Sequence, residues 1–280
     1  MKRLFLLILL QAGLVLATPT NLQKENLVAW CIVPFDASQR SPEERAKMLN
    51  ELGIKRCAYD WRKKHIPEFE EEILQYQKHG IEYFAFWGEH PEAFRLFEKH
   101  QLTPQIWKMF RDPEGESQEK KVAQAVEFLK PLAKRTAAMK CKFALYNHGG
   151  WSGEPANLVA VCKGLHQLGF EHVGIVYNWH HGQSRMDHWK ADLTLMKPFL
   201  HCLNLNGMKR DPKDKILPIG KGDFESKMLG VLIESDYKGA IGILDHRNET
   251  DAKIALRENF SGLADLMKQF ERDSTERPAR

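Results

Sequence analysis

Two short segments of this sequence combine histidine with amide side chains. Residues 146–151 read YNHGGW, and residues 178–181 read NWHH. A neutral imidazole carries protons near neutral pH and is a good metal ligand, whereas amides hydrogen-bond to hydroxyl groups. The combination is typical of a site that binds a hydroxyl-rich molecule and moves its protons, with His148 and His181 as base and acid.

Local geometry decides which of these side chains face a common site. Alternation along a strand places Tyr146 and His148 on one face, and the two glycines after His148 let the backbone turn close to a ligand. The alternative for His148 is a hydrogen bond to loop backbone. The side chains of His180 and His181 should diverge on an extended segment, so we expect His181 in the site and one of the two in solvent.

Three other segments add polar candidates. Asn204 and Asn206 lie two residues apart and point the same way on a strand, either to position a ligand or to form a hydrogen-bonded amide ladder. Asp245 and His246 end another strand, where only one of two neighbours should point inward. Lys108 follows an aromatic residue and is interpreted either as a base or charge clamp or as a surface lysine.

These residues make up the predicted site. The predicted proton-transfer residues are His148, His181, Lys108, His246 and Asp245. The predicted substrate-binding residues, whose rings stack on sugar faces and whose polar groups bind hydroxyls, are Trp87, Tyr146, Asn147, Asn178, His180, Asn204 and Asn206.

The elements that must position these residues alternate along the chain between short apolar runs and longer amphipathic stretches. Strands are expected at residues 27–33, 54–59, 81–87, 104–110, 142–148, 173–179, 201–206 and 240–246. Helices are expected from residue 41, at 66–79, 91–99, 117–134, 155–168, 187–200 and 223–235, and from about 250 to 271. This alternation predicts a parallel sheet. Eight equal units without a linker predict an α/β fold, a single (β/α)8 TIM barrel over residues 18–273, with a polar tail at 274–280 and its chemistry at the carboxyl ends of the strands.

The first residues have the pattern of a secretory signal peptide. A basic start at residues 1–3, an apolar run at 4–10 and small residues up to Ala17 predict cleavage after Ala17 and a secreted or periplasmic protein. The apolar run is short for a membrane span of about 20 residues, so an uncleaved anchor is the alternative. After cleavage we expect no membrane association.

Composition and charge narrow the function classes. The chain has 280 residues, of which 43% are hydrophobic and 28% charged, as in ordinary globular proteins. Its formal charge of +4 falls to +2, with 39 basic and 37 acidic residues, once Lys2 and Arg3 leave with the signal peptide. That excess is too small for a dedicated nucleic-acid binder. Five cysteines without a CxxC pair predict buried free thiols, with one disulfide as the alternative. The sequence has no GxGxxG, GxxxxGK(S/T) or HExxH motif that would indicate a cofactor.

Several motifs resemble one known group of enzymes, the xylose isomerase-like TIM barrels or sugar phosphate isomerase/epimerase family. Residues 145–150 (LYNHGG) resemble the family's fifth-strand motif, and residues 178–181 resemble its sixth-strand D-x-x-H. The end of the chain is similar to the end of these barrels at residues 220–224 (GKGDF), Leu229, Leu232 and residues 237–239 (YKG). The resemblance covers essentially the whole chain after the signal peptide. It implies a TIM barrel and a reaction among those of sugar isomerases, epimerases, keto-sugar lyases and an abasic-site endonuclease.

The resemblance implies a bound metal ion, but this sequence has other residues at the family's metal-ligand positions. Members of the family typically hold a Mn or Mg ion with a Glu, an Asp, a His and a second Glu from the fifth to eighth strands. The corresponding residues here are Tyr146, Asn178, Asn204 and Leu244. Neutral groups in place of anionic oxygens predict that the usual Mn/Mg site is absent. The alternative is a histidine-based zinc site that uses His148, His181 and either His246 or Asp245.

Two functions fit these observations. The first is a secreted enzyme that acts on an unphosphorylated sugar or keto-sugar by proton transfer alpha to a carbonyl, giving isomerisation, epimerisation or elimination. We expect an unphosphorylated substrate because of the export signal and because no phosphate-binding loop is visible. The second is a sugar-binding barrel that has lost the metal site and the catalysis. Export and near-neutral charge argue against DNA repair.

Overall fold

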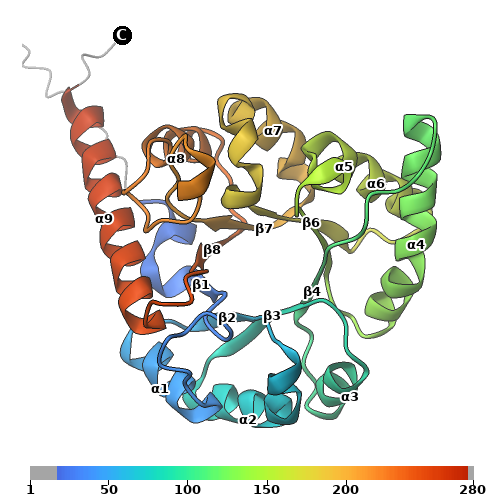
Figure 1. Cartoon of the computed structure of the whole chain (residues 1–280), viewed down its shortest axis with the longest axis horizontal. Coiled ribbons are helices and arrows are strands. Elements are labelled where there is room, and N and C mark those ends of the chain that lie inside the picture. Colours follow the sequence, from blue (N-terminus) through green and yellow to red (C-terminus); the bar gives the residue numbers. More distant parts are fainter. Residues whose placement is uncertain (1–17, 277–280) are drawn as a thin grey trace, which may run out of the picture.

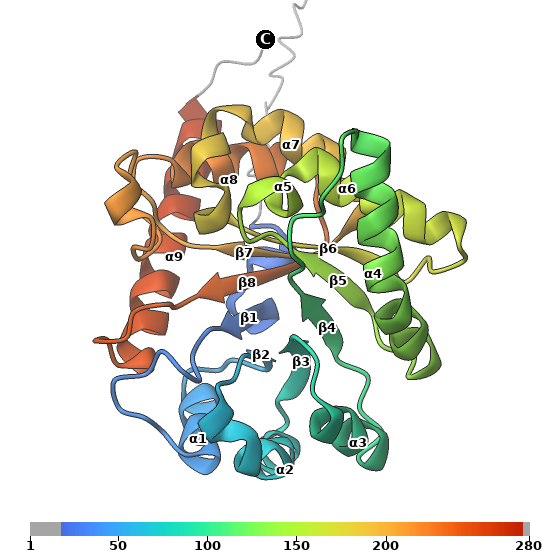
Figure 2. The same ribbon diagram turned by 45° about the vertical axis from the view of Figure 1, so that its right-hand side comes forward.

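The computed structural model describes residues 18–276, and these form a closed barrel of eight parallel strands. Each strand pairs with the next along the chain, and β1 closes the ring against β8, with Trp30 opposite Leu244. Helices surround the barrel in chain order (Figures 1 and 2). The predicted (β/α)8 TIM barrel is therefore confirmed. The predicted signal peptide lies outside the described residues.

The strands and helices follow the predicted alternation. The strands are β1 (Leu27–Trp30), β2 (Arg56–Tyr59), β3 (Glu82–Trp87), β4 (Gln105–Lys108), β5 (Phe143–Tyr146), β6 (Val173–Asn178), β7 (Leu200–Leu205) and β8 (Ala240–Leu244). The α-helices are α1 (Pro42–Glu51), α2 (Phe69–His79), α3 (Pro91–Lys99), α4 (Gln118–Ala138), α5 (Gly150–Gly153), α6 (Pro155–Gln167), α7 (Trp189–Met196), α8 (Glu225–Glu234) and α9 (Ala252–Glu276). Short 3-10 helices are η1 (Thr20–Leu22), η2 (Lys24–Asn26), η3 (Lys63–Glu68), η4 (Trp179–His188), η5 (Lys197–Phe199) and η6 (Pro212–Asp214).

Capping residues explain why helix α1 begins where it does. The Ser41 side chain accepts the backbone N–H of Glu44, and the Glu44 carboxylate accepts the backbone N–H of Ser41. This reciprocal pair satisfies N–H groups that have no partner within the helix. Pro42 occupies the first turn, where its missing N–H is not needed.

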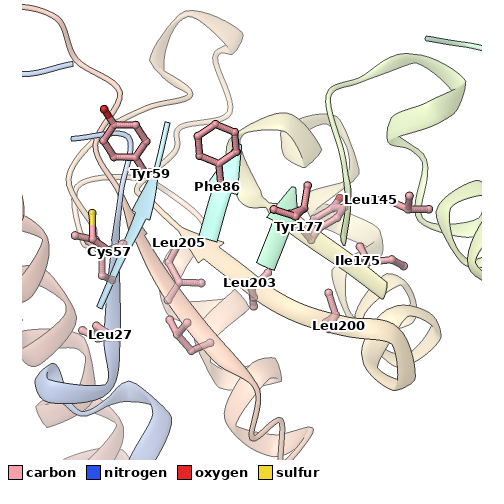
Figure 3. Close-up of a cluster of buried hydrophobic side chains, with 14 of the residues drawn as sticks. Leu27, Cys57, Tyr59, Phe86, Leu145, Ile175, Tyr177, Leu200, Leu203 and Leu205 are labelled. Carbon is pink, nitrogen blue, oxygen red and sulfur yellow. The ribbon is translucent and has the colours of Figure 1, made fainter. Parts of the chain in front are cut away.

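The strands separate two buried layers of side chains. Outward-facing residues pack against the helices, and Figure 3 shows part of this layer, including Tyr59 and Phe86. Residues of the opposite face point into the barrel, where Trp30, Trp107 and Tyr146 belong to a second buried cluster. The rings of Trp30 and Trp107 meet edge to face with centroids 4.9 Å apart. Large aromatic side chains therefore fill the interior of the barrel.

Several element ends differ from the sequence prediction by a few residues, as at β1 and α9. Strand β1 ends at Trp30 and not at residue 33, because Cys31 adopts a left-handed backbone conformation with a φ of 62°. Helix α9 continues to Glu276, so residues 274–276 of the predicted tail extend the last helix.

Two further observations concern the thiols and the helices. All five cysteines are buried and free, so the predicted free thiols are confirmed. Within residues 18–276, no helix combines the length and the apolar character that crossing a membrane requires.

Candidate functional site

Four histidines meet at the mouth of the barrel, which we define as the carboxyl ends of the strands and the loops after them. His148 follows β5, His180 and His181 follow β6, and His246 follows β8. The ring centroids of His148 and His181 are 4.4 Å apart, and those of His180 and His181 are 3.8 Å apart. The His246 ring lies 5.8 Å from that of His180. We call these four side chains the imidazole cluster, and it contains three of the predicted proton-transfer residues.

The two neighbouring histidines do not diverge, so that prediction from the sequence is wrong. The chain leaves β6 at Asn178 and enters the 3-10 helix η4 at Trp179. Alternation therefore no longer applies at His180 and His181. His180 is buried and His181 is partly exposed, but both rings belong to the cluster.

Two glycines position His148. Gly149 and Gly150 have φ values of 84° and 63°, a left-handed region that favours glycine. A Cβ on Gly150 would lie 2.3 Å from Oδ2 of Asp112, which accepts the N–H of Trp151 at 2.9 Å. A side chain does not fit there, and the predicted tight turn after His148 is confirmed.

Burial keeps three rings of the imidazole cluster, those of His180, His181 and His246, in the neutral form. Desolvation is the main cause that lowers the pKa of His181 from 6.5 to about 3 and that of His246 to about 4, and the nearby Lys215 ammonium adds to both shifts. Burial also lowers the pKa of His180 well below its usual value. Among the described residues, neither ring nitrogen of His180 nor Nδ1 of His246 has a hydrogen-bond partner. Neutral rings with free nitrogen atoms are suited to bind hydroxyl groups of a ligand.

Two buried amides next to the imidazoles form a neutral layer inside the barrel. Asn204 of β7 donates from Nδ2 to Oδ1 of Asn178 on β6 at 2.7 Å. Nδ2 of Asn178 has no partner among the described residues. Tyr146 of β5 lies nearby with its ring 5.7 Å from that of His181, and burial raises the pKa of its phenol well above the usual value. This layer offers hydrogen-bonding groups without charge.

Two other predicted amides are occupied by the backbone. Asn147 joins β5 to β6, since its Nδ2 donates to the carbonyl of Asn178 at 3.1 Å and its Oδ1 accepts the N–H of Asn178 at 2.7 Å. Asn206 lies beyond the end of β7 and donates from Nδ2 to the carbonyls of Gly207 and Lys215 at 2.7 and 2.8 Å. Both amides hold strand ends and loops. Asn147 binds the backbone with both its amide groups, and we assign it a positioning role. Oδ1 of Asn206 has no partner among the described residues and stays available for the predicted substrate contact.

The far side of the mouth, at the ends of β8, β1 and β2, carries buried carboxyl groups. Asp245 follows β8 and is 1% exposed, and Asp60 follows β2 and is 2% exposed. Burial raises the pKa of each to about 7, although Arg62 lowers that of Asp60 and Arg247 lowers that of Asp245. Both carboxyl groups raise the pKa of the buried Cys31 thiol, whose shift is mainly due to desolvation. Asp245 and Asp60 are called the carboxyl side of the mouth below.

The sequence places Asp60 and Arg62 after a predicted strand, but no site role is predicted for them or for Cys31. Asp60 comes directly after a predicted strand, and an acidic residue at the carboxyl end of a barrel strand is the signal that would have found it. Cys31 carries a weaker signal, because a cysteine beside an apolar run is typical of a core residue. Arg62 is exposed, and only its position over the mouth distinguishes it from other surface arginines.

Aromatic rings and an arginine frame the carboxyl side. The Arg62 guanidinium lies 5.2 Å from the ring centroid of Phe35 and 5.9 Å from that of Trp87. The ring of His246 lies 3.8 Å from that of Phe35. Trp87, a predicted sugar-binding residue, is half-buried, and its carbonyl accepts the indole N–H of Trp61 at 2.9 Å. Aromatic faces beside polar groups suit the ring of a sugar.

Lys108 does not join the imidazole cluster. Its Nζ lies 2.7 Å from Oε1 of Glu89, in the loop after β3, and its side chain is partly exposed. The ammonium is therefore already engaged by a carboxylate. This ion pair favours the charge clamp or the surface lysine over the base among the roles predicted for Lys108.

The donor set at the mouth does not fit the divalent metal that the resemblance implies. The four family ligand positions are buried and neutral, and Oδ1 of Asn178 already accepts a hydrogen bond from Asn204. Over residues 18–276, no three or more His, Cys, Asp or Glu side chains are grouped so that they would hold a metal ion. The same finding applies to the histidine-based zinc alternative.

A cavity of about 660 Å³ lies between the loops after β1, β2 and β8. Among the described residues, none of the four histidines of the imidazole cluster lines this cavity. One of its lining carboxylates, Asp36, accepts hydrogen bonds from the Arg40 guanidinium at 2.8 Å and from the N–H groups of Ser38 and Ala252 at 3.1 and 3.0 Å. These bonds tie the loop after β1 to the start of α9. We interpret this lining as structural and place the chemistry at the mouth.

Comparison with known proteins identifies the fold. No protein-family model matches the sequence, and a search of curated proteins gives no match. Among solved structures, an IolI protein with a bound zinc atom has 12% identity and a TM-score of 0.69, over 88% of this chain and 99% of that one. A 3-keto-D-glucoside 4-epimerase from E. coli has 12% identity and a TM-score of 0.64, over 88% of this chain and 100% of that one.

A third solved structure carries the name of the resembled family. It is a xylose isomerase domain protein from Alicyclobacillus acidocaldarius, with 14% identity and a TM-score of 0.59 over 87% of this chain and 99% of that one. At such identities the likeness shows the fold alone. The chain has the fold of the xylose isomerase-like TIM barrels, as the motifs predict.

Proposed function

We propose that this protein is a sugar-modifying enzyme that acts on an unphosphorylated sugar or keto-sugar by proton transfer at the carbon next to a carbonyl. The imidazole cluster is the observation that carries the proposal, because it gathers four imidazole rings at the mouth of the barrel, and the buried nitrogen atoms of His180 and His246 include some without a hydrogen-bond partner among the described residues. Isomerisation, epimerisation and elimination all begin with this proton transfer. The fold shared with a 3-keto-D-glucoside 4-epimerase supports a sugar as the substrate class.

The lining of the imidazole side supports an uncharged, hydroxyl-rich substrate. His180 and His181 are neutral near pH 7, and the Asn178–Asn204 pair carries no charge. Such groups donate to and accept from hydroxyls without a counter-charge for a phosphate. Trp87 supplies an aromatic face at the other side of the mouth.

The imidazoles suit proton exchange with substrate oxygen atoms. With a pKa of about 3, the ring of His181 stays neutral through the physiological range and holds an N–H that can be donated. A neutral imidazole that donates to an oxygen gaining negative charge stabilises an enediolate. His148, whose ring is 4.4 Å from that of His181, provides a second ring at the same place. Positioned groups of this kind typically contribute about 10²–10⁴-fold each.

Deuterium incorporation tests the proposal directly. The protein without residues 1–17 is incubated in D2O with a panel of unphosphorylated aldoses, ketoses and keto-glycosides, and proton NMR follows the hydrogen next to the carbonyl. We expect exchange with at least one sugar. Exchange with none of them contradicts an enzymatic role.

The second candidate function is a sugar-binding barrel without catalysis. Its support is the neutral set of side chains at the four family ligand positions, Tyr146, Asn178, Asn204 and Leu244. Calorimetry on the same panel separates the two functions. Binding of a sugar that undergoes no exchange supports the binding protein.

Export is the final part of the proposal. The pattern of residues 1–17 supports cleavage after Ala17 and a secreted or periplasmic location. Amino-terminal sequencing of the protein recovered from the periplasm or the medium should begin at Thr18. An intact Met1 in that fraction contradicts cleavage.

A further inference from the structure

Asp60 lies at the carboxyl end of β2, on the face of the strand that points into the barrel. Ala58 belongs to the interior cluster, whereas Tyr59 belongs to the outer layer of Figure 3. Alternation along β2 therefore turns Asp60 inward. Its charge raises the pKa of the Cys31 thiol after β1 and of the Tyr146 phenol on β5. The Asp60 carboxyl therefore points into the barrel at the carboxyl end of β2.

The Asp60 carboxyl is buried but not saturated with hydrogen bonds. The side chain is 2% exposed, and its Oδ1 has no partner among the described residues. Asp36 at the same end of the barrel shows the opposite arrangement, since both its oxygens accept from the Arg40 guanidinium at 2.8 and 2.9 Å. A buried carboxylate oxygen without a protein partner is available to a group of a bound ligand or to a water molecule.

The charges around Asp60 come from several elements. Burial raises its pKa to about 7, while Arg62 of the same loop and Arg45 of α1 lower it. A carboxyl group with a pKa near the operating pH can both accept and return a proton. The other titratable groups that its charge affects are Cys31, Cys57, Tyr59 and Tyr146.

We propose that Asp60 is the catalytic residue that removes and returns the carbon-bound proton of the sugar, an inference that rests on the function proposed above. Oδ1 of Asp60 takes the proton from the carbon next to the carbonyl. The C–H electron pair forms the C=C bond of an enediol, and the carbonyl π pair becomes a lone pair on oxygen.

The imidazole cluster completes the proton balance. A neutral imidazole donates its N–H proton to the former carbonyl oxygen and accepts at its other nitrogen the proton of the neighbouring hydroxyl as that oxygen becomes a carbonyl. Asp60 then returns its proton to the former carbonyl carbon. The net result is an isomerised sugar, and the cycle needs no oxidant, reductant or other co-reactant.

Substitution of Asp60 by asparagine tests this role. Asp60→Asn keeps the shape of the side chain but removes the proton acceptor. We expect exchange of deuterium next to the carbonyl to fall by about 100-fold or more, while calorimetry shows the affinity for the same sugar changed by less than about 3-fold. Retained exchange in Asp60→Asn overturns the role of Asp60. Absence of exchange in the unsubstituted protein overturns the proposed function instead.

The matched control is Asp36→Asn, a buried carboxyl at the same end of the barrel with both oxygens bonded. It should lower the Tm but leave deuterium exchange within about 3-fold at a temperature where the variant is folded. An equal loss of exchange in both variants would show that the Asp60 effect is structural, and would overturn the proposal.

A titration of the unsubstituted protein covers the case in which Asp60→Asn does not fold. Carbon-13 NMR of labelled aspartate carboxyls gives the ionisation midpoint of Asp60 without any substrate. A midpoint that coincides with the acidic limb of the exchange rate against pH supports the proposal. A midpoint below pH 5, apart from that limb, overturns it.

Discussion

The mouth of this barrel has an imidazole side, made by the cluster after β5, β6 and β8, and a carboxyl side, made by the aspartates after β8 and β2. Desolvation dominates the pKa shifts on both sides but moves them in opposite directions. The pKa of His181 falls to about 3, whereas the pKa of Asp60 rises to about 7. In both cases burial favours the neutral form of the side chain.

The consequence differs between the two sides because the ordinary pKa values differ. Histidine titrates just below neutral pH, so a downward shift leaves His181 neutral throughout the physiological range. Aspartate titrates in acid, so an upward shift brings the titration of Asp60 and Asp245 to neutral pH. One side therefore suits hydrogen bonding to oxygen, and the other suits proton transfer from carbon.

The largest effect is expected when rings are removed from the imidazole side. His148→Ala and His181→Ala should each lower turnover by about 10²–10⁴-fold. The fold should remain intact, because His148 is exposed and His181 is partly exposed. Deuterium exchange measures the turnover of each variant, and circular dichroism shows whether the variant is folded.

The control for the ring variants is His188→Ala, an exposed histidine of η4 outside the cluster. It should leave the exchange rate within about 3-fold. Unchanged exchange in both ring variants would remove the imidazole side from the mechanism.

The next effect is a pH-dependent stability difference on the carboxyl side. The folded pKa of Asp60, about 7, lies above its ordinary value of 3.8. The protonated carboxyl therefore contributes its full stabilisation of the folded state below pH 3.8. This contribution is lost as the pH rises from 3.8 through about 7. Asp60→Asn lacks this loss, so its free energy of unfolding relative to the unsubstituted protein should increase by about 2 kcal/mol from pH 5 to pH 8. Urea unfolding at both pH values measures the difference.

Asp36→Asn is the control for this stability measurement. Because the Asp36 carboxylate accepts several hydrogen bonds, its replacement should lower the free energy of unfolding at both pH values. A gain for Asp60→Asn that is the same at pH 5 and pH 8 would argue against a titrating carboxyl.

A smaller effect is expected from the neutral amide layer that joins the imidazole side to the interior. Asn204→Ala removes the 2.7 Å hydrogen bond to Oδ1 of Asn178 and leaves that buried oxygen without a donor. We expect a loss of about 1–3 kcal/mol in the free energy of unfolding. Denaturant unfolding measures it, with the exposed Asn248→Ala as a control that should stay within about 0.5 kcal/mol. A loss as small as that of the control would mean that the amide pair adds little to stability.

The smallest effect is expected at Lys108, outside both sides of the mouth. Its partly exposed ion pair with Glu89 should stabilise the protein by about 0–1 kcal/mol. Lys108→Gln should therefore change turnover by less than about 3-fold, measured by the same deuterium exchange. A loss of about 100-fold would restore Lys108 as the base.

The sequence predicts the fold well, because the fold depends on local patterns. The alternation of apolar runs with amphipathic stretches repeats at each unit, and the barrel follows from it. His148 and His181 stand at strand ends in the sequence, and the strand ends share one face of the barrel.

Other parts of the site depend on features that the patterns do not contain. The convergence of His180 and His181 follows from a 3-10 helix that begins directly after β6. The amide of Asn147 binds the backbone of Asn178, a residue of another strand. The position of Asp60 after a strand is visible in the sequence, but its burial and its unpartnered oxygen are seen only in the folded molecule.

Residue identity and order were enough to establish the barrel, the strand ends and the neutral groups at the family's ligand positions, since each of these is a property of a short stretch of chain. Only the folded molecule shows which rings lie close together, which amides are hydrogen-bonded to the backbone and which groups titrate near neutral pH. These properties depend on distances across the barrel and on the removal of water from side chains that are far apart in the sequence.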